Sequence, residues 1–133
     1  MQFKNDLHKK RFMDAIKKMD HGDNTQMAII FLLTADRQLW NRCKIYRIDN
    51  KIPIHRVRVK CVKEDAYVLF CGARDLALGT TYISMHDLVD REVVSGPIWK
   101  LIFTALEIRR YGVGIVIPRP KNKKEGEKKC PIG

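Results

Sequence analysis

The segment MAIIFLLTA, residues 27–35, constrains the fold more than any other part of the chain, because it is apolar on every face. A helix without a polar face has to be enclosed by other elements, so the segment predicts a central, fully buried helix. A buried strand is the competing interpretation, since a short apolar run fits either state. Asn24 or Thr25 is suited to cap a helix that runs through Ala35, which favours the helix.

Further segments have the residue spacing of helices. The first of them has Asn5 or Asp6 as its cap, and Gly79 and Gly112 follow two others as stop signals. The segments are residues 6–20, a basic helix of about ten residues with Leu39, Cys43 and Tyr46 at helical spacing, residues 64–78, residues 84–90, and the segment from Ser95 to Gly112. The pattern therefore predicts a mainly α-helical fold of five to six helices.

One segment, IHRVRVKCV at residues 54–62, has the period of a strand instead. Its apolar residues point one way and its cations the other, with Val57, Val59 and Cys61 set against Arg56, Arg58 and Lys60. A strand needs a pairing partner, and the other candidate is GIVI near residue 115. The fold prediction thus leaves room for a small two-stranded β-ribbon.

The chain divides into a body and a tail. With 133 residues it fits one compact core. From Pro118 onward the sequence turns polar and rich in lysine, a composition that cannot bury itself. We therefore predict a helical domain over residues 1–117 and a lysine-rich C-terminal tail over residues 118–133.

Positive charge is concentrated in one part of the body. Lys and Arg outnumber Asp and Glu by 26 to 15, which gives a net charge of +11. Residues 37–63 hold nine of the basic residues and one acidic residue, Asp49, and so carry +8 by themselves. Residues 119–133 add +4, from six basic and two acidic side chains, and the rest of the chain is close to neutral. Such a surplus favours a polyanionic partner.

We therefore predict a surface that binds nucleic acid or a nucleoprotein. Its candidate residues are Arg37, Trp40, Arg42, Lys44, Arg47, Lys51, Arg56, Arg58, Lys60, Lys63, Lys121, Lys123 and Lys124. Aromatic side chains among arginines are able to stack bases while the guanidinium groups hold phosphates. In the alternative interpretation, Trp40 and Tyr46 face the core and the charges form an ordinary solvated surface. An acidic protein surface, such as that of a nuclease, is the other class of partner.

The segment from residue 83 to residue 117 has the order of a winged helix-turn-helix, with a short capped helix, a turn and a longer helix. The first half of the longer helix is PIWKLIF, in which Lys100 is the one charged residue, and this makes a poor surface for reading bases. Arg109 and Arg110 fall at its end, where cations stabilise the helix dipole without a ligand. A winged helix-turn-helix regulator is thus kept as an alternative prediction.

The sequence shows no catalytic or metal-binding pattern. Its histidines are scattered through separate segments, and neither HExxH nor CxxC occurs. We predict a protein that is not an enzyme, without cofactor, metal or small-molecule substrate, although a basic ribonuclease using His55 beside Arg56 and Arg58 is an alternative. No apolar stretch is long enough to span a membrane and the N-terminus lacks the apolar core of a signal peptide, so the expected location is cytoplasmic, with reduced thiols.

Three stretches carry a resemblance to known sequences: FKNDLHKKRFMDAI (3–16), FLLTADRQLW (31–40) and LEIRRYGVG (106–114). The first fits the pattern F-x-N-x-x-H-x-x-R-F. The chain resembles a family of small helical proteins from phages and integrative mobile elements of Gram-positive bacteria, whose shared motifs serve packing. The resemblance implies a mobile-element context, in which small proteins bind nucleic acid or obstruct host defence in the manner of anti-CRISPR proteins. It implies no catalytic residues.

Overall fold

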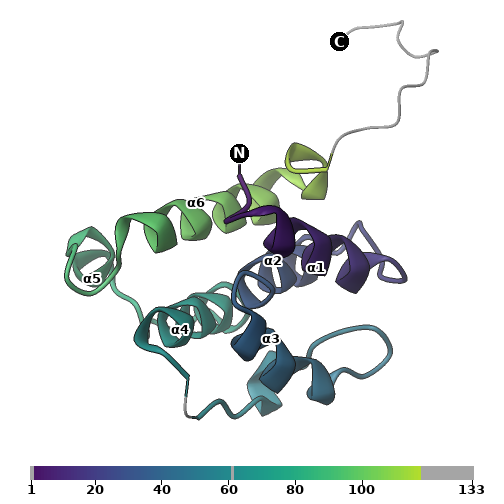
Figure 1. Ribbon diagram of the computed structural model, residues 1–133, viewed down its shortest axis with the longest axis horizontal. Helices are drawn as coiled ribbons and strands as arrows, with labels where there is room; N and C mark the ends of the chain where they lie inside the picture. The colour runs from purple at the N-terminus through teal and green to yellow at the C-terminus, as the bar shows by residue number, and fades with distance from the viewer. Residues whose placement is uncertain (1, 61, 118–133) are drawn as a thin grey trace, which may run out of the picture.

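The computed structural model describes residues 2–60 and 62–117, and within these ranges the chain is helical and has no strand (Figure 1). This confirms the prediction of a mainly α-helical, compact domain of five to six helices. The elements are α1 (Asp6–Ile16), α2 (Asn24–Leu33), α3 (Arg37–Cys43), η1 (Lys44–Tyr46), η2 (Ile54–Arg56), α4 (Glu64–Leu78), α5 (Met85–Val89), α6 (Gly96–Tyr111) and η3 (Val113–Ile115), where η marks a 3-10 helix. The predicted tail, residues 118–133, lies outside the described residues.

Helix α2 is the centre of the fold, as its apolar sequence predicts. Every residue from Met27 to Ala35 is 0% exposed. Helices α4 and α6 pack against α2, and α1 and α3 also contact it (Figure 1). The N-cap is Asp23, whose carboxylate accepts a hydrogen bond from the Gln26 N–H at 3.1 Å, and not Asn24 or Thr25 as predicted. A carboxylate at that position also suits the positive end of the helix dipole.

The N-terminal helix is held to α2 by two polar contacts. His8 is 0% exposed, and its Nε2 lies 2.8 Å from the carbonyl oxygen of Phe31. The Arg11 Nε donates to the carbonyl oxygen of Thr34 at 2.8 Å. The helix begins after Asn5, one of the two predicted caps, and ends at Ile16, earlier than the predicted residue 20.

The predicted β-ribbon is wrong. Ile54–Arg56 form the 3-10 helix η2, residues 57–60 run on without strand pairing, and the other predicted strand contains the 3-10 helix Val113–Ile115. The alternation itself is real, because Val57 is 1% exposed while Arg56 and Arg58 are exposed. An extended segment that lies on helices buries every second side chain just as an edge strand does, so the period alone does not require a sheet.

The remaining helices follow their sequence signals. Helix α4 ends at Gly79, which has the left-handed φ of 73° that glycine adopts without strain. Ser84 and Asp87 form a reciprocal capping box at the start of α5. Helix α6 buries the expected stripe on its inner face, which consists of Ile98, Leu101, Ile102, Ala105 and Ile108. None of the described helices is both long enough and apolar enough to cross a membrane.

Candidate nucleic-acid interface

Most of the predicted cations lie on the surface. The exposed ones are Arg37, Lys44, Lys51, Arg56, Arg58, Lys60 and Lys63. Of these seven, one is paired with a described carboxylate, since Lys51 Nζ lies 3.5 Å from Asp23 Oδ2. The other six keep their charge toward solvent, which is the state a binding surface for phosphates requires.

The two aromatic residues of the basic segment, of which Trp40 is a predicted site residue, serve the core instead. Trp40 is 7% exposed, so it does not present its ring to a base, and the alternative interpretation of this residue was the better one. Tyr46 is half-buried and packs against the core. The Arg47 guanidinium donates a hydrogen bond to the carbonyl oxygen of Ala15 at the end of α1, which ties the loop after α3 to that helix. Arg42 is also half-buried. Lys121, Lys123 and Lys124 lie outside the described residues.

The exposed cations from the last residue of η2 to the residue before α4 form what we call the basic ridge. They are Arg56, Arg58, Lys60 and Lys63. The buried Ile54 and Val57 anchor the start of the ridge to the core, with exposed fractions of 3% and 1%. Two hollows adjoin the ridge, since Arg56 lines one and Arg58 lines the other.

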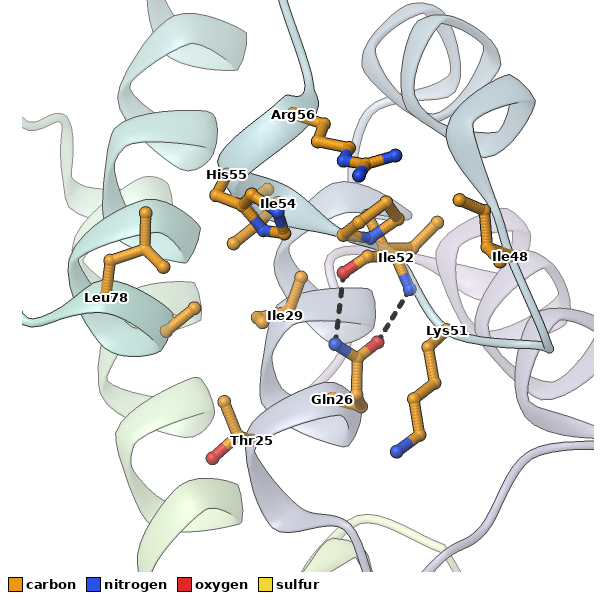
Figure 2. Close-up of a pocket in the computed structure, with 12 residues that line it drawn as sticks. Thr25, Gln26, Ile29, Ile48, Lys51, Ile52, Ile54, His55, Arg56 and Leu78 are labelled. Carbon is orange, nitrogen blue, oxygen red and sulfur yellow. Dashed lines mark hydrogen bonds between the residues drawn. The ribbon is translucent and has the colours of Figure 1, made fainter.

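The first hollow is a cleft of about 620 Å³ between α2, the loop over residues 48–56 and the last turn of α4 (Figure 2). Ile29, Ile52 and Ile54 line its apolar part, whereas Lys51, His55 and Arg56 supply its polar groups. Figure 2 shows Leu78 and Ile48 on opposite sides of the cleft. The cleft thus combines an apolar wall with basic side chains.

The loop beside the cleft is held in place by Gln26. The Gln26 side chain donates to the carbonyl oxygen of Ile52 at 3.1 Å and accepts from the Ile52 N–H at 2.9 Å (Figure 2). A tight turn precedes this clamp, with positive φ angles of 53° at Asp49 and 62° at Asn50, residue types that tolerate this region. Because both contacts are to backbone, the clamp fixes the path of the loop.

The second hollow, of about 210 Å³, brings arginine and tyrosine side chains together. Its lining includes Arg58 from the ridge, Tyr67 and Arg74 from α4, and Tyr82 from the loop after α4. The guanidinium carbon of Arg74 lies 5.3 Å from the ring centroid of Tyr82, within cation–π range. Tyr67 is 50% exposed and Tyr82 is 56% exposed, so both rings are accessible from solvent.

Asp75 positions the loop that carries Tyr82. Its Oδ1 accepts from the Thr80 hydroxyl at 2.6 Å and from the Tyr82 N–H at 2.9 Å. Its Oδ2 accepts from the Ile83 N–H at 2.8 Å. Three donors on one carboxylate fix the backbone directly after α4, and with it the ring of Tyr82 over Arg74.

Sequence reasoning missed Tyr67, Arg74 and Tyr82 as parts of the site. The signal on α4 was present, since Tyr67 and Arg74 are seven residues apart and therefore share a face of the helix. That this face lies beside Arg58 follows only from how the segment over residues 57–60 packs on α4, which no local pattern encodes. The aromatic residues of the surface are thus tyrosines from outside the basic segment.

The described cysteines are not reactive thiols. Cys43 and Cys71 are both buried. Burial raises the pKa of the Cys43 thiol to about 12 and also raises the pKa of Cys71. The thiolate is the nucleophilic form, so a raised pKa keeps both in the unreactive state.

Carboxylates and histidines do not converge in the described part of the chain. No group of three His, Cys, Asp or Glu residues there is placed to hold a metal ion. Asp87 completes the capping box of α5, and Asp90 accepts from the Glu92 N–H at 2.9 Å. His55 is exposed on η2 at the edge of the cleft.

In its described residues the protein is thus a small helical domain with a basic ridge that adjoins two hollows. Comparison with known proteins gives no relative for it: no protein-family model, no curated protein and no solved structure matches the chain. The resemblance to a family from phages and mobile elements therefore stays a prediction.

Proposed function

We propose that this protein binds single-stranded nucleic acid along the basic ridge. The observation that carries the proposal is the second hollow, in which the ridge residue Arg58 lies beside the exposed rings of Tyr67 and Tyr82. Cations hold phosphates and aromatic rings stack unpaired bases, and their combination is typical of single-strand binding. A duplex keeps its bases stacked inside and gains nothing from exposed tyrosines, so a single strand is the favoured form.

The exposed cations of the basic segment, those of the ridge included, determine how such binding responds to salt. If five of the exposed cations contact phosphates, the logarithm of the binding constant falls by about 3.5 per tenfold rise in salt. This corresponds to a loss of about a hundredfold in affinity between about 50 mM and about 200 mM salt. Binding of this kind is non-catalytic and needs no cofactor.

The test is fluorescence anisotropy with labelled single-stranded RNA and DNA and with a duplex of the same sequence. We expect Tyr82→Ala to weaken binding by about 1 to 3 kcal/mol, or about 5- to 150-fold, because a stacked base is lost. The matched control is Tyr111→Ala, since Tyr111 is 66% exposed at the end of α6. For the charge, Arg58→Ala is compared with Arg91→Ala, another exposed arginine. Absence of binding at about 50 mM salt, where counterion release helps most, would contradict the proposal.

A protein partner is the second candidate, and two exposed isoleucines favour it. Ile45 is 76% exposed and Ile48 is 51% exposed, and both lie within the basic segment. Apolar anchors surrounded by cations suit an acidic protein surface. In this version the protein inhibits a host defence nuclease, as anti-CRISPR proteins do, and the resemblance to a mobile-element family supports it.

The two candidates respond differently to one pair of substitutions. Ile45→Ser and Ile48→Ser remove apolar anchors and leave the charges, so they should preserve affinity for a single strand. The same variants should abolish inhibition of DNA cleavage by a purified CRISPR nuclease if a protein partner is correct. Either function places the protein in the cytoplasm, and the buried, unreactive Cys43 and Cys71 suit a reducing compartment.

A further inference from the structure

Apolar side chains gather on the outer surface of α5 and α6, which faces away from the core. On α6, Trp99 is half-buried, Phe103 is 41% exposed and Leu106 is 39% exposed. Their spacing of four and three residues places them on one side of the helix. On α5, Met85 is 84% exposed and Val89 is 69% exposed, four residues apart. We call these five residues the α5–α6 apolar surface.

Val89, Trp99 and Phe103 form the continuous centre of this surface. Val89 and Trp99 line the same groove of about 300 Å³ between α5 and α6. The ring centroids of Trp99 and Phe103 are 4.4 Å apart, so the two rings touch. Helix α6 therefore has two apolar sides, of which the inner one is buried against α2 and the outer one has no cover within the described chain. An uncovered apolar patch on a small domain marks an interaction site.

The charge around this surface differs from that of the rest of the protein. Residues 80–111 hold four basic and four acidic residues and are therefore neutral, whereas residues 37–63 carry +8. A second copy of the chain is repelled wherever two basic surfaces meet, but it meets no net repulsion here. Helix α6 also lies at the opposite edge of the molecule from α3 (Figure 1), so this contact keeps the basic segments of two copies apart.

We propose that the α5–α6 apolar surface is the contact between two copies of this chain in a symmetric dimer. The C-terminal residues do not suit the role of a cover, because residues 118–133 contain one large apolar residue, Ile132. If a fully exposed large side chain has an area of about 200 Å², the exposed fractions of the five side chains of the α5–α6 apolar surface add up to roughly 400 to 500 Å² on each copy. A standard interface buries about 800 Å² on each partner, so we expect a weak dimer with a micromolar dissociation constant.

A two-fold axis at Phe103 makes the charges of α6 complementary. In an antiparallel pair of helices, residues equally spaced on either side of the axis face each other. Glu107 is four residues after Phe103 and therefore comes level with Trp99, beside Lys100 of the second copy. Each Glu107 then meets the Lys100 of the other copy, so the pair occurs twice in the dimer. This pairing favours the antiparallel arrangement of the two α6 helices.

The test is sedimentation equilibrium of the full chain with reductant and without nucleic acid, from about 5 to about 300 μM, a range that spans micromolar dissociation constants. We expect the average mass to rise from the monomer value of 15.5 kDa toward twice that value. Phe103→Glu should raise the dissociation constant at least about tenfold. The control is Leu7→Glu, which adds the same charge at a leucine that is 64% exposed on α1, and it should behave like the wild type.

A charge exchange tests the geometry of the contact. Lys100→Glu and Glu107→Lys should each weaken the dimer, and the double variant should restore it, because every pair then has opposite charges again. Circular dichroism checks that each variant folds. A wild-type protein that stays monomeric at every concentration overturns the proposal, as does equal weakening by Phe103→Glu and Leu7→Glu. The anisotropy experiment on the ridge is separate, so failure of the dimer leaves the proposed function standing.

Discussion

The buried His8 predicts that the protein loses stability in mild acid. Its Nδ1 accepts a hydrogen bond from the Lys4 N–H at 2.9 Å, so the proton of the neutral ring is on Nε2, which donates to the carbonyl oxygen of Phe31 at 2.8 Å. The rings of Phe3 and Phe31 surround it, with centroids at 5.1 Å and 4.8 Å. A second proton on this ring would displace the Lys4 contact and place a charge among aromatic rings.

The magnitude follows from the shift in pKa. Burial is the largest cause that lowers the pKa of His8 from its ordinary 6.5 to about 4. The folded state therefore resists protonation that the unfolded chain accepts, so stability is complete above about pH 6.5 and falls as the pH drops toward 4. The loss reaches about 2 kcal/mol at pH 5 and about 3 kcal/mol below pH 4. Domains of this size have about 5 to 15 kcal/mol in total.

The assay is urea denaturation, followed by circular dichroism, between pH 7 and pH 4. The variant His8→Gln removes the titrating group and keeps both a donor and an acceptor. We expect it to be less stable than the wild type at pH 7. Between pH 7 and pH 5, however, its free energy of unfolding should fall by about 2 kcal/mol less than that of the wild type. His55→Gln repeats the substitution at an exposed histidine on η2 and corrects for the exchange itself. Equal slopes for wild type and His8→Gln would refute the assignment of the acid loss to this residue.

Two further predictions concern the loops beside the ridge. Gln26→Leu leaves the N–H and carbonyl of Ile52 without their partner, so it should lower the free energy of unfolding by about 1 to 3 kcal/mol and speed amide hydrogen exchange over residues 48–54. The control is Gln38→Leu, at an exposed position of α3, which should change neither quantity. Asp75→Asn removes one of the two acceptor oxygens that three donors share, so it should lower the free energy of unfolding by about 1 to 2 kcal/mol. It should also lower the affinity for a single strand, because Tyr82 loses its position. Unchanged affinity in Asp75→Asn would show that Tyr82 does not depend on this carboxylate.

The fold was predictable because its signals are local. A segment that is apolar on every side has one place in a small helical domain, and residues 27–35 occupy it. Helix ends were predictable where a single residue type determines them, as at Gly79 and Ser84. The strand over residues 54–62 was wrong because alternation reports which side chains are buried and not what the backbone pairs with.

The candidate site was only partly predictable, for a physical reason. Positive charge is unfavourable in a core, so most of a basic segment has to lie on the surface, and Arg56 and Arg58 do. Aromatic residues are stable both in a core and on a surface, so the sequence does not determine where Trp40 lies. In the structure Trp40 is buried. The tyrosines of the second hollow meet Arg58 only through tertiary packing, which spacing in the sequence does not report.

The motif F-x-N-x-x-H-x-x-R-F and the basic ridge have separate roles. Asn5 caps α1, His8 and Arg11 bind carbonyl oxygens of α2 and the residue after it, and Phe12 is 0% exposed, so the motif fixes how α1 packs. None of these contacts reaches Arg58 or its neighbours on the ridge. Substitutions on the ridge therefore leave the contacts that fold the chain intact. A loss of binding in Arg58→Ala is accordingly evidence about binding, whereas a loss in a motif variant is first evidence about folding.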